Sequence, residues 1–313
     1  MLQNFYSSVS AVLPMIISIA LGILLKNKKI IDDDTIKKVN LIAFNVFFPC
    51  MIFNSMYWIE DKNVINPKLF IIFTIVIIIA LIIGLSTSLK AENDSKTRGA
   101  MLQIFLRSNF MVLGFPILRS LYGEEGIAVA SLLIILVIPL TNILTVSELS
   151  IFGNGKLSFT RLFKDIFSNI QIMSSFAGLF AVLVDLKLPI AFENLITSFS
   201  NAGTPVALLM LGASINLNGI KEKKKDIAIC TIMRLVILPL MAVVIGLLAG
   251  LRGMEYLMLI VFFAVASPTA CYTLAMIMDS DYKFTANCVA ISSAICPFTL
   301  FLFIFFSKCL HLM

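Results

Sequence analysis

The stretch 106–123, LRSNFMVLGFPILRSLYG, decides how the rest of the chain is interpreted. It lies in a hydrophobic segment that is long enough to cross a membrane. Its polar and helix-breaking residues are Arg107, Ser108, Asn109, Gly114 and Pro116. An unpaired charge is costly in lipid, and a proline frees backbone carbonyls that no water can satisfy there. The stretch therefore predicts a broken helix that lines a polar cavity and forms half of a substrate site.

The composition is that of a membrane protein. Of 313 residues, 59% are hydrophobic and 13% are charged, whereas a soluble domain has about 45–50% apolar and about 25% charged residues. The net charge of +6 fits basic loops that set the orientation in the membrane, so no nucleic-acid partner is predicted. The six cysteines contain no C-x-x-C pair and the single histidine is His311, which disfavours a metal site and a disulfide framework.

Ten hydrophobic segments predict an all-α polytopic membrane protein. A membrane-spanning helix needs about 20 apolar residues, which is the criterion applied here. The segments are 8–25, 38–57, 67–89, 99–120, 126–147, 163–184, 190–216, 227–250, 254–278 and 284–306. Their connections are short and leave no room for a separate soluble domain.

The basic residues of the connections predict the orientation. The odd-numbered connections carry sixteen Lys and Arg residues, and the even-numbered connections with the C-terminus carry six. Because basic residues are enriched on the cytoplasmic side, both termini are predicted to lie outside the cytoplasm of a cell inner (plasma) membrane. Arg107 and Arg234 lie inside predicted spans, and snorkelling to the interface is the favoured interpretation of Arg234.

Features that recur about 157 residues apart indicate an internal repeat. Pro49 and Pro205 are 156 residues apart, and Pro139 and Pro297 are 158 residues apart. The two copies predicted are residues 1–150 and 160–313. Since five spans per copy is an odd number, the second copy must be inverted in the membrane, as in many secondary transporters.

The repeat assigns a partner to the opening stretch. Moving about 157 residues along from Ser108 leads to Ser267, Pro268 and Thr269 in the ninth span. Spans four and nine are therefore predicted to be paired broken helices that cross near the bilayer centre. At such a crossing the aligned N–H dipoles of the half-helices favour an anion.

Several short motifs lie in a consistent order along the whole chain. They are Arg107-Ser108-Asn109-Phe110, Gly114-Phe115-Pro116, Tyr122-Gly123-Glu124, Pro139 with Asn142, Pro205-Val206-Ala207-Leu208, Leu211-Gly212-Ala213-Ser214 and Ser267-Pro268-Thr269-Ala270. In these motifs the sequence resembles the auxin efflux carrier family of bacteria and plants. The short connection between spans five and six, about fifteen residues, is that of the bacterial members.

The resemblance implies a ten-helix fold of two inverted five-helix repeats, like that of the bile-acid/sodium symporters. In such folds spans 1, 2, 6 and 7 form a scaffold domain, and spans 3–5 and 8–10 form a transport domain in which helices 4 and 9 cross. Members of the family are thought to move carboxylates, namely indole-3-acetate in plants and malonate or malate in bacteria.

The residues predicted to bind substrate are Asn109, Ser108, Arg107, Asn142, Ser267, Thr269 and Tyr272, with Gly114, Pro116 and Pro268 as helix breaks. Asn109 is the first choice, because a carboxamide beside a helix break can donate to a carboxylate. The alternative interpretation of Asn109 is a hydrogen bond between helices. Arg107 has three interpretations: a counter-ion for the substrate, a side chain that snorkels to the interface, and a partner of an acid such as Glu148.

These features predict a secondary transporter for a small organic anion that works by alternating access in the lipid bilayer. The alternatives are a sodium-coupled symporter of the bile-acid type, a channel and a membrane sensor. No nucleophile–base constellation is present, so no enzyme and no cofactor are predicted. Sodium coupling, proton coupling and uniport stay open, as does a homodimer. No acidic residue is expected in mid-span, since Glu148 lies near a predicted end.

Overall fold

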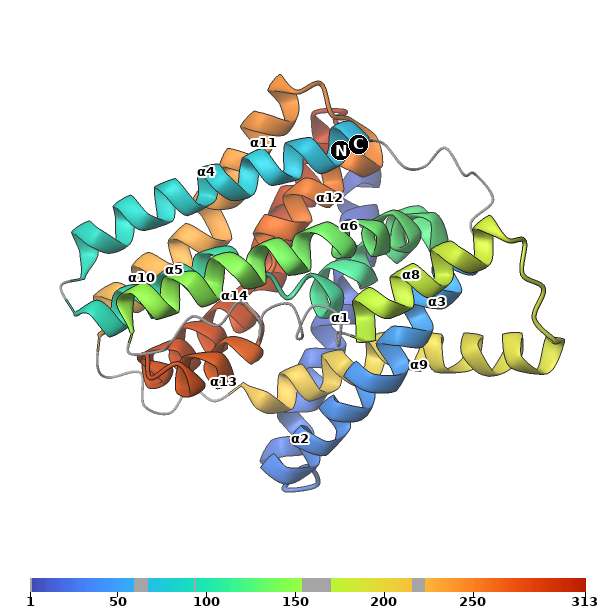
Figure 1. Ribbon diagram of the computed structural model, residues 1–313, viewed down its shortest axis with the longest axis horizontal. Helices are drawn as coiled ribbons and strands as arrows, with labels where there is room; N and C mark the ends of the chain where they lie inside the picture. Colours follow the sequence, from blue (N-terminus) through green and yellow to red (C-terminus); the bar gives the residue numbers. More distant parts are fainter. Residues whose placement is uncertain (1, 59–66, 93, 154–169, 216–222) are drawn as a thin grey trace.

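The computed structural model describes residues 2–58, 67–92, 94–153, 170–215 and 223–313, and within these ranges every regular element is a helix (Figure 1). The predicted all-α class is therefore confirmed. The start of the predicted segment 163–184 lies outside the described residues, as do five of the basic residues used for the orientation: Lys62, Lys156, Arg161, Lys164 and Lys221.

One set of helices, called here the first helix group, packs around α9. Its members are α1 (Leu2–Asn27), α2 (Asp33–Ile42), η1 (Ala43–Phe47), α3 (Phe48–Tyr57), α8 (Ile170–Leu183) and α9 (Ile190–Ser214). α1 and α3 both pack on α9, and α3 also packs on α8. A Cβ atom at Gly22 would overlap the carbonyl oxygen of Leu209, and one at Gly212 would overlap that of Ile19. Glycine at both positions lets α1 and α9 cross with their backbones in contact.

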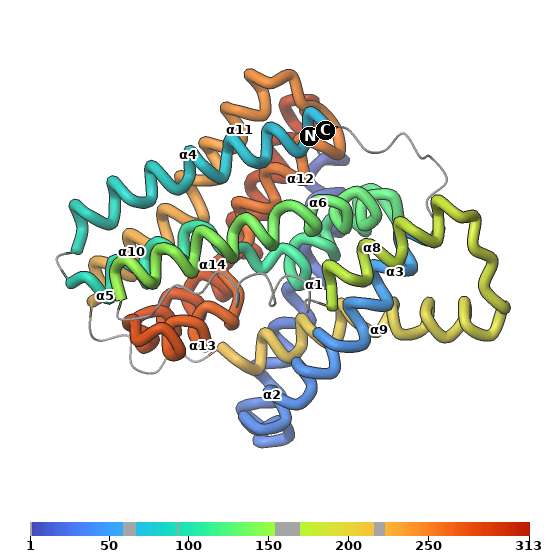
Figure 2. The backbone as a smooth tube through the Cα atoms, viewed as in Figure 1, coloured from blue at the N-terminus to red at the C-terminus, as the bar shows by residue number. Residues whose placement is uncertain are grey.

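The remaining helices form the second helix group. They are α4 (Pro67–Ala91), α5 (Ser95–Leu106), η3 (Phe110–Gly114), α6 (Phe115–Phe152), α10 (Lys224–Ile232), η4 (Met233–Ile237), α11 (Leu238–Leu248), α12 (Gly253–Ala264), α13 (Ala270–Ile277) and α14 (Tyr282–Cys309). α4 packs on α5, α11 on α12, and α13 on α14. In Figure 2, α2 of the first group lies at the bottom centre with α3 and α9 to its right, and α4, α10 and α11 of the second group lie on the left and upper left. The two groups meet where α14 and α6 contact α1, and where α6 contacts α3 and α8.

Seven helical runs among the described residues are long and apolar enough to cross a membrane, and the shorter helices α8 and α12 are also apolar. The multi-pass character is therefore confirmed, while the count of ten crossings stays a prediction. The run Ser95–Phe152 has 58 residues, more than twice the roughly 20 that one crossing needs. It contains both the fourth and the fifth predicted segments. The chain turns between them at Gly123, whose φ of 63° favours glycine.

Three π-helical segments each end two residues before a proline. η1 precedes Pro49, η3 precedes Pro116 and η4 precedes Pro239. A proline in a helix lacks the N–H for the usual hydrogen bond and its ring clashes with the carbonyl four residues earlier. The wider π turn accommodates both effects, so the helix continues through the proline. Such π segments are common at functional sites.

Charged residues from three distant connections gather at one end of the second group. Lys223, just before α10, lies 3.1 Å from a carboxylate oxygen of Asp281 and 3.8 Å from one of Asp94. Asp94 caps the start of α5 by accepting from the Thr97 amide at 3.0 Å, and Asp281 caps α14 in the same way. The buried Thr97 hydroxyl joins the two carboxylates. The connections before α5, α10 and α14 therefore meet at one end of the second helix group. Lys223, Asp94, Asp281 and Thr97 are called here the Lys223 cluster.

The chain termini lie together at the opposite end of α14 (Figure 1). The Lys308 ammonium donates to the Ser7 hydroxyl, and the Gly253 amide donates to the carbonyl oxygen of Leu312 at 2.9 Å. The 28 residues of α14 separate this end from Asp281. Both termini therefore lie on the side opposite the Lys223 cluster.

The Lys223 cluster is held by ionised groups. Burial lowers the pKa of Lys223. The hydrogen bond to Asp281 and the nearby acidic charges raise it by more, so the net pKa is above the ordinary value. The hydrogen bond from the Thr97 hydroxyl lowers the pKa of Asp94 below its ordinary value. The contribution of Asp94 to stability is thus present above the ordinary carboxyl pKa and is lost as the pH falls through its lowered pKa. That of Lys223 is lost only as the pH rises through its raised pKa.

We expect Lys223→Gln to lower the apparent melting temperature of the purified protein at pH 7 by about 2–4 °C, which corresponds to roughly 1 kcal/mol for a partly exposed ionic cluster. The difference from wild type should shrink as the pH falls below about 4, because the carboxylates become protonated. Lys38→Gln is the control, since Lys38 forms an exposed pair with Asp34. Thermal scans from pH 3 to pH 8 measure both effects, and a difference that stays constant down to pH 3 would contradict the ionic account.

Candidate functional site

The first helix break lies at residues 107–109, between α5 and η3. Arg107 has extended backbone angles (φ −79°, ψ 132°) and the helix resumes at Phe110. The prediction that Gly114 and Pro116 break the helix is wrong. Gly114 ends η3 and Pro116 is the second residue of α6, because the π turn carries the helix through the proline.

The second break lies at residues 265–269, between α12 and α13. Val265 is extended (φ −76°, ψ 150°) and Pro268 lies within the break, where the sequence places it. The fourth and ninth spans are therefore both discontinuous, as predicted.

Three hydrogen bonds join the two breaks. The Asn109 amide donates to the carbonyl oxygen of Ala266 at 2.9 Å. The Ser108 hydroxyl donates to Phe262 O at 2.6 Å, and the Ser267 hydroxyl donates to Ile104 O at 2.7 Å. Ser108 and Ser267 are 159 positions apart, and their acceptors are 158 positions apart. Each break thus supplies a serine to the last turn of the half-helix that precedes the other break.

Arg234 of η4 also bonds the ends of both half-helices. It is 0% exposed. Its guanidinium donates to Phe105 O at 2.8 Å, at the end of α5. It also donates to Phe262 O at 2.9 Å and, through Nε, to Val265 O at 2.8 Å, at the end of α12. The interpretation of Arg234 as a side chain that snorkels to the interface is wrong, since all three bonds are to buried backbone carbonyls.

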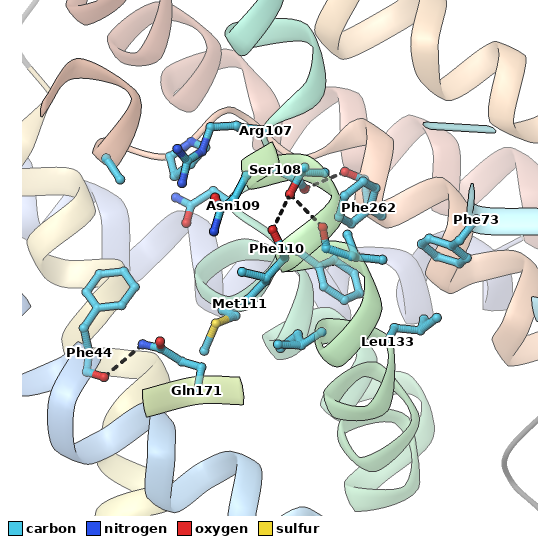
Figure 3. Close-up of a pocket in the computed structure, with 17 residues that line it drawn as sticks. Phe44, Phe73, Arg107, Ser108, Asn109, Phe110, Met111, Leu133, Gln171 and Phe262 are labelled. Atoms are coloured by element: carbon cyan, nitrogen blue, oxygen red, sulfur yellow. Dashed lines mark hydrogen bonds between the residues drawn. The ribbon is translucent and has the colours of Figure 1, made fainter. Parts of the chain in front are cut away.

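A cavity of about 240 Å³ lies against the breaks. Residues of both breaks line it, together with α6, α8 and η1. The polar residues in the lining are Arg107, Ser108, Asn109, Thr141, Asn142 and Gln171. Figure 3 shows Arg107, Ser108 and Asn109 side by side, and Gln171 donating to the Phe44 carbonyl oxygen, a bond of 3.0 Å.

A second cavity, of about 580 Å³, adjoins the first and shares Phe44, Asn109, Pro268 and Ala270 with it. One wall comes from the breaks and α13, and the other from α2, η1 and α9 of the first helix group. Asn109 is 6% exposed and lies in both linings. The two cavities therefore meet at the break, between the two helix groups.

The charged residues in the two linings are both basic. Arg107 lies in the smaller cavity and Lys37 in the larger one, and neither lining contains an acidic residue. Within the described part of the chain, the Arg107 side chain makes no ion pair. The linings are otherwise apolar or neutral. This arrangement favours a negatively charged occupant.

Comparisons with known proteins indicate a membrane transport protein. A family described as "Membrane transport protein" matches the chain twice, over residues 7–156 and 156–304. The chain belongs to this membrane transport protein family, and the predicted family is confirmed. A protein of Methanothermobacter thermautotrophicus described as an uncharacterized transporter is 25% identical over 299 residues, covering 92% of this chain and 95% of the relative. An uncharacterized transporter of Methanocaldococcus jannaschii is 23% identical over 292 residues, covering 90% and 93%.

The structure places most of the predicted site residues in the linings of the two cavities. Arg107, Ser108, Asn109 and Asn142 line the smaller cavity. Thr269 and Tyr272 line the larger one, where Tyr272 also packs edge-on against Tyr282. Ser267 lies in neither lining: it is 0% exposed and its hydroxyl is bonded to Ile104 O. Ser267 therefore joins the breaks instead of facing a cavity.

Several lining residues were not predicted from the sequence. Gln171 and Thr141 lie on α8 and α6, and Phe44 and Lys37 come from η1 and α2. Gln171 carried a signal, because it is an amide inside an apolar segment. Lys37 carried none, since a lysine near a helix start is ordinarily assigned to a loop that sets topology.

Glu148 lies near the end of its helix, as expected, but it is buried. α6 continues to Phe152, five residues beyond the predicted segment, so Glu148 lies within the helix and is 5% exposed. Neither of its carboxylate oxygens has a hydrogen-bond partner among the described residues. The suggested pair with Arg107 does not form, because Arg107 faces the smaller cavity and Glu148 is absent from its lining. The carboxylate near the end of this helix is thus buried, which its position in the sequence did not indicate.

We expect Ser267→Ala to destabilise the protein more than Ser108→Ala. Ser267 is the one described donor to Ile104 O, so its loss leaves a buried carbonyl unpaired, which costs about 1–3 kcal/mol. Phe262 O keeps its bond to Arg234 when Ser108 is removed, so that loss is closer to about 1 kcal/mol. Thermal unfolding of both variants in detergent measures the order, and equal or reversed shifts would show that the breaks are not held in this way.

Proposed function

We propose that this protein is a secondary transporter for a small organic anion, a mono- or dicarboxylate such as malonate, malate or an auxin-like indole carboxylate. The observation that carries the proposal is the pair of adjoining cavities at two broken helices, with basic residues and no acidic residue in their linings. The family supports transport, and the site supports the anion.

The charges at the breaks support a carboxylate. η3 and α13 begin at the breaks, and residues at or beside both starts line the cavities. The first N–H groups of a helix have no partner inside it, and each helix start carries roughly half a positive charge. Two starts and the Arg107 guanidinium together amount to about two positive charges. This total matches a dicarboxylate and also accommodates a monocarboxylate.

Asn109 and Arg107 are the side chains to which we assign substrate contact. Asn109 lines both cavities, and its backbone amide is bonded to Ala266 O, so the backbone at Asn109 is held by the other break. An amide donates one hydrogen bond to a carboxylate oxygen, and a guanidinium donates two in parallel. Asn142, Thr269 and Tyr272 complete the proposed contacts.

The two helix groups support an alternating-access movement. The larger cavity lies between them, with α2, η1 and α9 on one side and the breaks on the other. We assign the first group to a scaffold domain and the second to a mobile transport domain, in the two inverted repeats 1–150 and 160–313. Displacement of the second group against the first would carry an anion bound at the breaks from one side of the membrane to the other.

The proposed orientation has both termini outside the cytoplasm and the Lys223 cluster inside. A C-terminal fusion to alkaline phosphatase, which is active only outside the cytoplasm, should then be active, and a C-terminal fusion to green fluorescent protein should be dark. The same reporters placed after Asp279, next to the Lys223 cluster, serve as the matched control and should give the opposite pattern. Fluorescence of the C-terminal fusion would show that the orientation is the reverse of the one proposed.

The transport proposal is tested by uptake into proteoliposomes. We expect saturable uptake of at least one of labelled malonate, malate and indole-3-acetate. Arg107→Gln should lower kcat/KM by roughly tenfold or more, because a hydrogen bond to a charged group contributes about 1.5–3 kcal/mol. Asn109→Ala should lower it several-fold. The absence of any saturable carboxylate flux would refute the transport proposal. A carboxylate flux that Asn109→Ala leaves unchanged would refute the contact assigned to Asn109.

Neighbouring lysines supply a matched control for the same assay. Lys37 lines the larger cavity, whereas Lys38 is paired with Asp34 on the surface. Lys37→Gln should therefore reduce uptake at low salt and lose its effect at high salt, since the contribution is a screened charge at a cavity mouth. Lys38→Gln should leave uptake unchanged at both salt concentrations.

A further inference from the structure

The backbone carbonyls freed at the two breaks have a donor in almost every case. The Arg107 amide bonds Gln103 O, Ser267 bonds Ile104 O, and Arg234 bonds Phe105 O at the end of α5. At the end of α12, Ser108 and Arg234 bond Phe262 O, and Arg234 also bonds Val265 O. Arg234 is the single side chain that reaches the carbonyl ends of both half-helices within the described residues.

The charge of Arg234 is balanced by the backbone. The carbonyl end of a helix carries roughly half a negative charge, so the two ends together carry about one. No described acidic residue forms an ion pair with Arg234. An uncompensated charge this deep in a membrane protein is costly, and here the two helix ends supply the compensation through three bonds of 2.8–2.9 Å.

Converging carbonyl oxygens at negative helix ends are also the arrangement that transporters use to hold a small cation. In this protein the guanidinium already fills that position. The residue 157 positions earlier is Ile77 of α4, so one arginine, contributed by the second repeat, serves the half-helices of both repeats. The starts of η3 and α13, which follow the breaks, lie beside the two cavities.

We propose that Arg234 is a resident cation of the crossing and occupies the position in which a coupling ion such as sodium would otherwise bind. Arg234 acts as a positioning residue: it fixes the half-helix ends and, through them, the anion site, without touching the substrate. Transport therefore does not depend on sodium at this position. A substitution by alanine removes the guanidinium and opens space beside three carbonyls, which then accept an external monovalent cation.

The test uses purified protein and needs no substrate, so its failure is distinguishable from failure of the proposed transport function on which the inference rests. Thermal unfolding is measured in sodium chloride, guanidinium chloride at millimolar concentration, and choline chloride at matched ionic strength. Wild type should unfold at the same temperature in all three. Arg234→Ala should unfold at a lower temperature in choline and regain at least about 3 °C in sodium or guanidinium.

Arg234→Leu is the matched control, because leucine fills the space with apolar atoms and leaves no room for an ion. It should be destabilised and insensitive to sodium. Arg234→Lys keeps a positive charge and three donors, and should be milder than either and also insensitive. If Arg234→Ala does not fold, the wild-type and lysine measurements decide.

Stabilisation of wild type by sodium over choline, or equal sodium effects on the alanine and leucine variants, would overturn the proposal. A merely structural arginine predicts destabilisation in all three variants with no cation dependence. In proteoliposomes, wild-type carboxylate uptake should be unchanged when choline replaces sodium on both sides. A loss of tenfold or more on that replacement would also overturn it.

Discussion

The structure depends on the need to satisfy backbone groups where two helices break inside a membrane. A break exposes carbonyls at the end of one half-helix and amides at the start of the next, and lipid offers no partner for either. Arg234, Ser108 and Ser267 satisfy the carbonyls at the two breaks. The helix starts that follow the breaks, at Phe110 and Ala270, line the cavities. The fold thus separates a side of the crossing that is closed by protein groups from a side that opens onto cavities.

This separation explains why the two intramembrane arginines have different surroundings. Arg234 is fully buried at the negative ends of the half-helices and is neutralised by them. Arg107 lies in a cavity beside the positive ends and has no ion-pair partner among the described residues. Arg234 is neutralised by protein groups, whereas Arg107 is available to a ligand. In the proposed function, an anion bound at the breaks balances the charge of Arg107.

Much of this could be predicted from the sequence, because the class and the position of the site rest on strong local signals. Hydropathy, the basic connections and the offset of about 157 residues identify the helical class and pair 106–123 with 267–272. The exact break could not be located, because a proline in a helix ordinarily predicts the interruption. A π turn absorbs Pro116, and the extended backbone lies at Arg107 instead. The role of Arg234 depends on contacts between distant spans, which no local pattern encodes.

The π segments connect these findings. Each precedes a proline, and a residue of each lies at the crossing or at its cavities: Phe44 in η1, Phe110 in η3 and Arg234 in η4. A π turn changes the direction in which the following side chains point without ending the helix. In η4 this places the guanidinium against both half-helix ends. Proline alone does not identify these sites, because Pro14, Pro139, Pro205 and Pro297 lie inside helices and Pro268 lies in a break. Both breaks lie where the opposite helix supplies hydrogen-bond partners.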